Sequence, residues 1–538
     1  MQRRFMAVGA IAVVVTAALL TGSGARSSAA TVRGAQRIPA GLAAAIHTRL
    51  GAGAIRKSAG PNYRIDPWLG YTVALSADGT TAVVGAPRAH GLWGAAYIFH
   101  ASDAGSWSST GTPTATLATK KAAEFGISVA ISADGTTAFV GAAYFKSSQP
   151  TGAVAVFHVS AENAWHSFST PTATLTKSRE VGVGVAVSSD GTTLVAGAPY
   201  AKGENGTGGA YVFHVSSEDA WASTSTPAAT LSNAAQGSGD GREGFAVAIS
   251  GDGMTVLVSD ADNENGGGAY LFHASAEDAW ASSSTPTAIL TDGNNTGGPG
   301  LGGSLALSAD GTLALLGAPY YGDAQTGFVD VFHSSAADAW ESTSTPTATL
   351  TKAGDSEDLL GFAVSVSDDG ATALVSDPLA DNYRGAAYVF RASSEGAWAS
   401  SSDPTATLTD SGGHVQDYLG IGGALSADGK TVIAGAPGVD KFTGAVDVFH
   451  VADASSWATT STPEASVTAK VLAACVVPKL KGQPSNYVRA DLGLARCRLG
   501  KVTKVHAKKS KRGRVVGQSP KAGKRLAIDA KVNIKVGK

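Results

Sequence analysis

Residues that carry chemistry are scarce in this sequence. It holds two cysteines in 538 residues, Cys475 and Cys497, and charged residues make up 16% of it. A Gly-x-Ser-x-Gly elbow, a His-Glu-x-x-His pair and a phosphate-binding loop are all missing, which removes the usual signatures of serine hydrolases, zinc proteases and nucleotide-binding enzymes. The cysteines have too few ligand residues nearby for a metal or catalytic role. One disulfide between them is the expected state in an exported chain.

Long apolar runs are also lacking, apart from one near the N-terminus. Residues 5–20 are apolar, follow Arg3 and Arg4, and precede small residues at 28–30. This run is short of the roughly 20 residues that a helix needs to span a bilayer. We therefore expect residues 1–30 to be a secretion signal, and the protein to be secreted and free of the membrane after cleavage.

What the sequence has in abundance is repetition. One clear copy runs from Phe125 to Leu175, and the sequence contains seven such copies. The shortest step between their Asp-Gly pairs is 56 residues and the longest is 62, and a fixed period of this kind is the signature of a repeat architecture. The Asp-Gly pairs begin at Asp78, Asp134, Asp190, Asp252, Asp310, Asp369 and Asp428, and the tryptophans of the copies are Trp107, Trp165, Trp221, Trp280, Trp340, Trp398 and Trp457.

Each copy predicts four β-strands. The first alternates in the manner of Phe245, Val247 and Ile249, and period-two alternation is the signal of a strand. A Ser-x-Asp-Gly turn follows, then a strand ending at Gly-Ala-Pro, a Gly-Ala-x-x-Phe-His strand and a Thr-Ala-Thr-Leu strand. Seven such units predict an all-β fold, a seven-bladed β-propeller of four-stranded blades over residues 69–470. An open β-solenoid is the alternative, but its repeats are shorter and lack hairpin signals.

Spacing divides the connections into two kinds. The Asp-Gly glycine is always six residues before the start of Gly-Ala-Pro, and the tryptophan is always six residues before a proline. The connections between strands two and three, and from strand four to the next copy, vary in length. Up-and-down strands would put both variable connections on one face, and binding sites usually lie on variable loops of a rigid scaffold. Neutral drift of the loops is the alternative interpretation.

Two repeated side chains are expected to be structural. The tryptophan of each copy suits a packing anchor whose N–H is satisfied locally. A histidine that ends the third strand in six copies, replaced by Arg391 in the other, indicates structure rather than catalysis. These histidines are His100, His158, His214, His273, His333 and His450.

The repeat resembles the FG-GAP repeat of integrin α-subunit propellers and their bacterial relatives. A glycine lies eight positions before every Asp of the Asp-Gly pairs, Phe125-Gly126 is literally Phe-Gly, and Gly-Ala-Pro is complete in four copies. The resemblance covers Leu69 to about Val467 and implies a propeller that binds other molecules.

The sequence departs from that family at the turn between strands one and two. The family often has a calcium loop there, Asp-x-Asp-x-Asp-Gly, whereas here the turn has one carboxylate. Calcium takes six to eight oxygen ligands, so we expect no calcium in these turns and no cofactor. Asp260, Asp262 and Glu264 are the best remaining metal candidates, and a solvated polar loop is the alternative for them.

Charge is distributed very unevenly. Residues 475–538 contain 18 Lys and Arg against two acidic residues, a net charge of +16, while the other 474 residues carry 23 basic and 41 acidic residues, a net charge of −18. A basic end on an acidic body favours a polyanionic partner, or contact between the two parts. Two independently solvated domains are the alternative.

Residues 475–538 resemble a PASTA domain, a small α+β module of bacterial penicillin-binding proteins and serine/threonine kinases. The segments 477–482 and 515–523 and the alternating strand Val532, Ile534 and Val536 carry the resemblance, with a helix expected over 485–496. The resemblance implies binding to peptidoglycan fragments. The basic residues expected to contact an anionic wall polymer are Lys501, Lys504, Lys508, Lys509, Lys511, Arg512 and Arg514. Nucleic acid would fit the charge, but export argues against it.

Residues 31–68 remain as a leader. Their segment 52–58 resembles the fourth strand of the repeat, so it either closes the ring of blades or belongs to a flexible linker.

Together these features predict a secreted, cell-wall-associated binding protein of the adhesion type that is not an enzyme. The basic domain would anchor it to a wall polymer, and the variable face of the propeller would meet an unknown protein or glycan. The alternative is a secreted propeller hydrolase or lyase whose site lies at the central channel, which would need convergent acidic or histidine side chains there.

Overall fold

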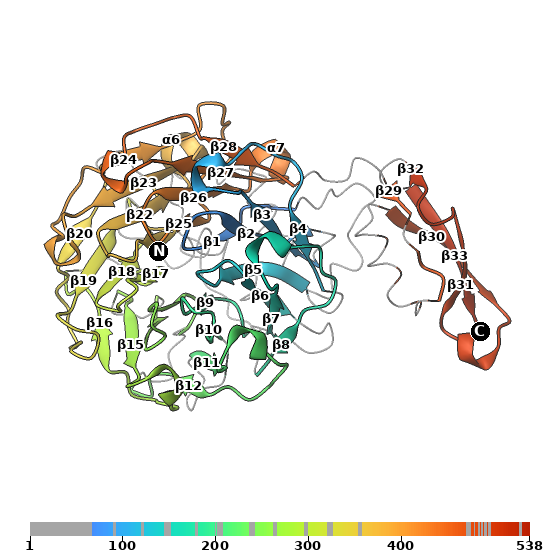
Figure 1. Ribbon diagram of the computed structural model, residues 1–538, viewed down its shortest axis with the longest axis horizontal. Helices are drawn as coiled ribbons and strands as arrows, with labels where there is room; N and C mark the ends of the chain where they lie inside the picture. Colours follow the sequence, from blue (N-terminus) through green and yellow to red (C-terminus); the bar gives the residue numbers. More distant parts are fainter. Residues whose placement is uncertain are drawn as a thin grey trace, which may run out of the picture. The chain divides into compact units, whose positions relative to one another are not determined.

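Seven sheets of four antiparallel strands, arranged as a wheel, make up the larger part of the computed structural model (Figure 1). In every sheet the strands follow one another in chain order, as in β1-β2-β3-β4. The fold is therefore the seven-bladed β-propeller that the repeats predict, followed by a small C-terminal domain. The structure describes residues 67–538 except 90–92, 120–122, 145–151, 178–180, 200, 202–207, 236–242, 262–265, 295–299, 320–325, 353–357, 470–474, 478, 483–484, 486–487, 489–491, 493–496 and 527–529.

The blades are numbered in chain order. Blade 1 is β1 Thr72–Leu75, β2 Thr81–Ala86, β3 Ala95–His100 and β4 Ala115–Leu117; blade 2 is β5 Ala123–Ile131, β6 Thr137–Tyr144, β7 Ala153–His158 and β8 Ala173–Leu175. Blade 3 is β9 Val185–Val187, β10 Thr193–Gly197, β11 Ala210–His214 and β12 Ala229–Leu231; blade 4 is β13 Val247–Ile249, β14 Thr255–Ser259, β15 Ala269–His273 and β16 Ala288–Leu290.

Blade 5 is β17 Ser304–Leu307, β18 Leu313–Gly317, β19 Val329–His333 and β20 Ala348–Leu350. Blade 6 is β21 Val364–Val366, β22 Thr372–Asp377, β23 Ala386–Arg391 and β24 Ala406–Leu408, with the short helix α6 Ala380–Tyr383 between its second and third strands. Blade 7 is β25 Gly423–Leu425, β26 Thr431–Ala436, β27 Ala445–His450 and β28 Ala465–Val467, with α7 Val439–Phe442 in the equivalent place.

The up-and-down order puts like connections on the same face, as the sequence spacing predicted. The strand 1–2 and 3–4 connections, which have constant spacings, share one face of the propeller. The strand 2–3 connections and those between blades share the other, which we call the variable face.

The core lies between blades rather than within one. A typical apolar cluster joins Val83 and Ile98 of blade 1 to Phe125, Val140 and other residues of blade 2. A blade has two apolar faces, so it must be covered on both sides by neighbours.

The ring closes between blade 7 and blade 1 by the contacts that join the other neighbours. A parallel bridge links Leu117 to Phe168 between blades 1 and 2, and the equivalent bridge links Thr110 to Val467 between blades 1 and 7. The segment 52–58, predicted as a ring-closing strand, lies outside the described residues.

Paired glycines let neighbouring backbones touch. A Cβ at Gly197, the first residue of Gly-Ala-Pro in blade 3, would meet the carbonyl oxygen of Gly244 in blade 4 at 2.0 Å. Gly244 itself has a φ of +88°, which favours glycine. Two glycines meet in this way at five of the seven blade boundaries, and at the other two the first position is a serine, Ser259 or Ser376, so this residue is small in every copy.

We predict that Gly197→Ala destabilises the propeller by about 3 kcal/mol, because the backbone atoms that it would strike have no side-chain freedom with which to yield. Gly396→Ala is the control, since its Cβ would meet nothing closer than 3.5 Å. Thermal and denaturant unfolding of both variants measures this. Equal stabilities of the two variants would contradict the contact.

The C-terminal domain has two small sheets, with a two-stranded pair of β29 Cys475–Val476 and β32 Arg525–Leu526. The second sheet has the order β30-β33-β31, formed by Cys497–Val505, Ala530–Gly537 and Val515–Ser519. Val532, Ile534 and Val536 of β33 point into the core, as the alternation predicted. Of the expected helix, Val488 and Leu492 are described as helical, and both are buried.

Candidate functional site

The face with constant connections is held together by one hydrogen bond repeated in every blade. The indole N–H of Trp107 donates to the carbonyl of Gly79 at 2.9 Å, which joins the strand 3–4 connection to the Asp-Gly turn of the same blade. The six equivalent tryptophans do the same at 2.8–3.0 Å. Because both connections must meet at this bond, neither can change length, which accounts for the constant spacings.

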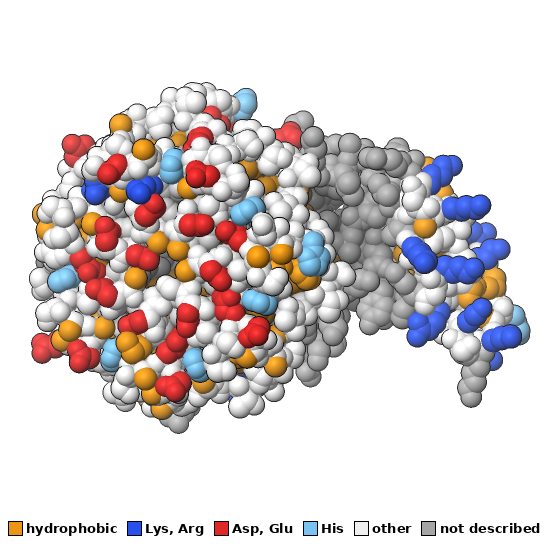
Figure 2. All heavy atoms as spheres, in the orientation of Figure 1, with side chains coloured by type: hydrophobic (Ala, Val, Ile, Leu, Met, Phe, Trp, Pro, Cys, Tyr) orange, Lys and Arg blue, Asp and Glu red, His pale blue; other side chains and the backbone are white. Residues whose placement is uncertain are grey.

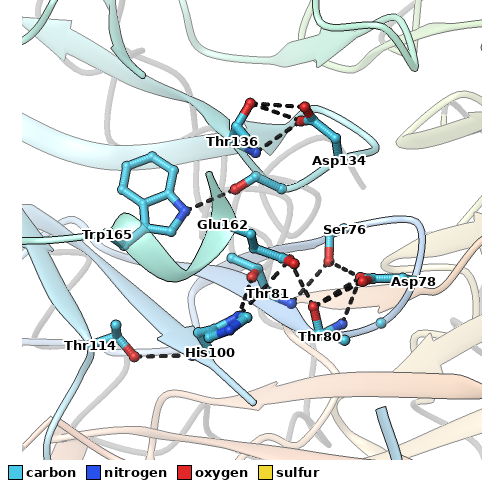
Figure 3. Close-up of polar contacts among 12 residues, drawn as sticks. Ser76, Asp78, Thr80, Thr81, His100, Thr114, Asp134, Thr136, Glu162 and Trp165 are labelled. Atoms are coloured by element: carbon cyan, nitrogen blue, oxygen red, sulfur yellow. Dashed lines mark hydrogen bonds and ion pairs between the residues drawn. The ribbon is translucent and has the colours of Figure 1, made fainter. Parts of the chain in front are cut away.

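The carboxylate of each Asp-Gly turn is occupied by its own turn. Figure 3 shows Asp78 accepting hydrogen bonds from the Ser76 hydroxyl at 2.7 Å and from the backbone N–H of Thr80 at 3.0 Å. The same arrangement recurs at Asp134. These donors satisfy the carboxylate without a cation. That the turns hold no calcium stays a prediction.

A second polar contact crosses from one blade to the next. The hydroxyl of Thr80 in blade 1 donates to Glu162 of blade 2 at 2.7 Å (Figure 3), and the pairs Thr136–Glu218 and Thr192–Glu277 repeat this at 2.7 and 3.0 Å. We call this contact the inter-blade latch. Each glutamate begins a short 3-10 helix just before the blade's tryptophan.

The two latch positions change together along the chain. Where the glutamate is replaced by alanine, the threonine of the preceding blade is also replaced, and neither residue occurs alone. The three pairs without a latch are Met254 with Ala337, Ala371 with Ala454, and Lys430 with Ala104, and the remaining pair, Thr312 with Glu395, keeps both residues.

We predict that a double-mutant cycle of Thr80→Val and Glu162→Gln gives a coupling free energy of about 1 kcal/mol, since a hydrogen bond to a charged group contributes that much or more. Met254→Val with Ala337→Gln places the same residues at a latchless pair and should give no coupling. The measurement is the unfolding free energy of the parent and of each single and double variant. Additive effects at Thr80 and Glu162 would refute the latch.

The repeated histidines lie in the blade ladders. The Nδ1 atom of His100 is 2.8 Å from the Thr81 hydroxyl of the adjacent strand, and its backbone N–H donates to Thr114. Four further histidines keep the threonine contact at 2.8–3.0 Å. In the copy with Arg391, the guanidinium Nε donates to the equivalent hydroxyl of Thr372.

Of the weak metal candidates, Asp260 alone lies among the described residues. It is buried, and the hydroxyl of Tyr270 donates to its Oδ2 atom. Burial and the nearby Asp260 carboxylate raise the pKa of Tyr270, so the phenol keeps its proton. Asp262 and Glu264 lie outside the described residues. In the parts of the chain that the structure describes, no group of three His, Cys, Asp or Glu side chains is placed to hold a metal ion.

Among the buried carboxyl groups that sequence reasoning missed are Asp330, Asp377 and Asp447, which are exposed by 0%, 1% and 3%. Burial raises the pKa of each to about 7. Asp330 and Asp447 occupy the same position in the third strand, where four other blades have tyrosine. That switch from tyrosine to aspartate was the signal available in the sequence.

We predict that Asp330→Asn stabilises the protein at pH 8 and not at pH 4. The Asp330 pKa of about 7 lies above its unfolded value near 3.8, so the folded state keeps a proton that the unfolded state loses between these values. The stability of the parent therefore falls as pH rises from about 4 to about 7. Above pH 7, the variant should be more stable than the parent by up to about 4 kcal/mol. Urea unfolding at both pH values tests this.

The control for this prediction is Asp338→Asn, because Asp338 is exposed on the same blade. It should change stability little at either pH. A variant at Asp330 that is less stable than the parent at pH 8 would contradict the sign of the effect.

The predicted wall-contact residues lie on one part of the C-terminal domain. Lys501 and Lys504 are on β30, an edge strand, and the others follow in the connection to β31 through the 3-10 helix η7 Lys509–Lys511. All are exposed except Lys509, whose side chain is not described. Figure 2 shows Lys and Arg side chains gathered on this domain, whereas Asp and Glu predominate on the visible face of the propeller.

Comparisons with known proteins identify one domain. The PASTA domain family matches residues 476–538, which agrees with the resemblance seen in the sequence. Among solved structures, the Kuenenia stuttgartiensis hydrazine synthase is similar over 73% of this chain and 99% of that chain, with 13% identity and a TM-score of 0.46. No curated protein matches the chain.

The resemblance of the repeats to FG-GAP stays a prediction. No helix among the described residues has the length and apolar character needed to cross a bilayer.

Proposed function

We propose that this protein is a secreted, non-enzymatic binding protein of the adhesion type, held at the bacterial cell wall by its C-terminal domain. The PASTA match at 476–538 carries this proposal, because such domains are associated with peptidoglycan. The propeller then serves as a scaffold whose variable face meets a protein or glycan. No specific observation favours the alternative of an enzyme at the central channel.

The electrostatics of the C-terminal domain support an anionic wall polymer as its partner. Its only acidic residues are Asp491 and Asp529, and neither lies within the stretch 501–514. Exposed Lys and Arg on an edge strand and the following turn can follow a polyanion along their length. Phosphate-bearing or carboxylate-bearing polymers are the partners that this arrangement fits.

A disulfide between Cys475 and Cys497 is part of the proposal. Cys475 lies on β29 of one sheet, and Cys497 begins β30 of the other. None of the described cysteines is free, and a secreted protein meets the oxidising conditions that a disulfide requires. The bond would tie the two small sheets together and stabilise the domain by about 3 kcal/mol.

We predict that replacing Lys501, Lys504, Lys508, Lys511, Arg512 and Arg514 by Gln weakens binding of the full chain to purified cell wall at least about tenfold, since several exposed ion pairs together supply more than 1.4 kcal/mol. Replacing Lys177, Lys352 and Lys430 of the propeller by Gln is the control. The measurement is the bound fraction in co-sedimentation at increasing salt. Retention that survives 1 M salt, where charges are screened within about 3 Å, would refute electrostatic anchoring.

A further inference from the structure

A cavity of about 220 Å³ opens between blades 6 and 7. The variable-face connections supply most of its wall: α6 and the residues after it, the segment from β24 to β25, and the connection at α7. Figure 1 shows α6 and α7 at the same edge of the wheel. The residues used below are Asp381, Arg384, Asp410, Asp417, Leu419, Ala436, Val439 and Asp447, and all of them line the cavity.

Asp447 forms the inner end of this cavity. Its side chain is exposed by 3% and lines the cavity wall. The hydroxyl of Ser466 is its hydrogen-bond partner, and a carboxyl group can accept about four such bonds. The Ser466 hydroxyl leaves room for further donors on the carboxyl group, and the ionised form of so deeply buried a group is costly unless a cation lies beside it.

Two further carboxylates and one cation, Arg384, line the cavity together with Asp447. Asp417 is exposed by 8% and accepts the backbone N–H of His414, and Asp410 accepts that of Gly412. Arg384 is 3.2 Å from Asp381, and both side chains are exposed by half or more. The imidazole of His414 is also exposed and is 3.8 Å from Asp417. The interior of the cavity is thus acidic.

Part of the remaining wall is apolar, beside the hydroxyl groups of Thr409, Ser411 and Ser461. Leu419 and Ala436 are buried, and Val439 is half-buried. The cavity is smaller than the 300 Å³ or more of pockets that take drug-sized ligands, so its size suits a single side chain. A short aliphatic stem ending in a positive charge matches an apolar wall with carboxylates at the inner end.

We propose that this cavity binds an alkylammonium group, such as a lysine side chain of a partner peptide, with the ammonium against Asp447 and Asp417 and the methylenes along Leu419 and Val439. The ammonium has three donors and no acceptor, which is the complement of carboxylate oxygens that only accept. A metal ion is a poorer fit, because no described group of three acidic or histidine side chains is placed to hold one. This inference rests on the proposed binding role of the variable face.

The test uses the full chain and two small probes, Nα-acetyl-lysine amide and Nα-acetyl-norleucine amide, which differ in the terminal ammonium. Binding is measured by ligand-observed NMR and calorimetry. We expect the lysine probe to bind and the norleucine probe not to bind. Asp447→Asn should weaken the lysine probe at least tenfold. Asp330→Asn is the control, since Asp330 has the same strand position in blade 5 and does not line this cavity.

The lysine probe should also bind several-fold more tightly at pH 8 than at pH 6, because burial holds the pKa of Asp447 at about 7 and the bound form needs its carboxylate. Burial also raises the pKa of Asp417, so its carboxylate form is likewise more populated at pH 8 than at pH 6. The charged neighbours of Asp417 are His414 and Arg384, which lower its pKa, and Asp410, which raises it.

Three results would each overturn the proposal. They are equal binding of the two probes, unchanged binding of the lysine probe by Asp447→Asn, and binding of calcium chloride in place of the lysine probe. If Asp447→Asn does not fold, as judged by its melting temperature, Asp417→Asn takes its place with the same expected loss. The probes do not involve the C-terminal domain. Failure here with intact wall retention would therefore refute the cavity alone, and loss of wall retention with intact probe binding would refute the anchoring alone.

Discussion

Contact between the backbones of neighbouring blades is the constraint on which the rest of the structure depends. A Cβ at Gly435 of blade 7 would meet the carbonyl oxygen of Gly70 in blade 1 at 1.9 Å, and Leu69 and Gly444 form a parallel bridge beside it. Chains can approach this closely only where side chains are absent. Five boundaries pair two glycines in this way, and the other two pair a glycine with a serine, Ser259 or Ser376. With close boundaries all round, seven blades close into a ring, and each connection has a fixed neighbour in the next blade.

The two faces of the ring differ because one of them is tied together. On the face with constant connections, the tryptophan bond joins the two connections of each blade, and the latch joins blades at pairs such as Thr80 and Glu162. A residue inserted into either connection would pull the indole N–H away from its carbonyl and leave a buried polar group unsatisfied. The variable face has no equivalent bond repeated in every blade among the described residues. Length changes are tolerated there, and cavities between blades form there.

The sequence predicted the fold well because it contains seven copies of one pattern, and each copy indicates the same four strands. In blade 3 the predicted Gly-Ala-x-x-Phe-His strand is β11 Ala210–His214, and in blade 5 the predicted Thr-Ala-Thr-Leu strand is β20 Ala348–Leu350. The latch was missed because its partners lie 82 residues apart, from Thr80 to Glu162, and meet only when the blade order is known. Its signal was present in the joint loss of threonine and glutamate, as at Met254 and Ala337. The cavity was beyond prediction, since it depends on three separate connections meeting between blades 6 and 7.

The two aspartates that replace tyrosine in the third strand show why burial alone does not identify a binding residue. Tyrosine at this position, as in Tyr211 of blade 3, places an aromatic ring between blades without the cost of a buried charge. Asp330 carries that cost with the Thr349 hydroxyl as its hydrogen-bond donor, and the structure offers no functional reason for it. Asp447 carries the same cost at the end of a cavity that also contains Asp410 and Asp417. An entering cation would lower the free energy of the ionised Asp447 carboxylate, so a residue that is unfavourable for stability becomes favourable for binding. The two aspartates differ in the connections around them, because Asp447 lies among the connections of the variable face that line the cavity and Asp330 does not line it. The binding role that we propose for Asp447 therefore depends on those connections as much as on the strand that carries it.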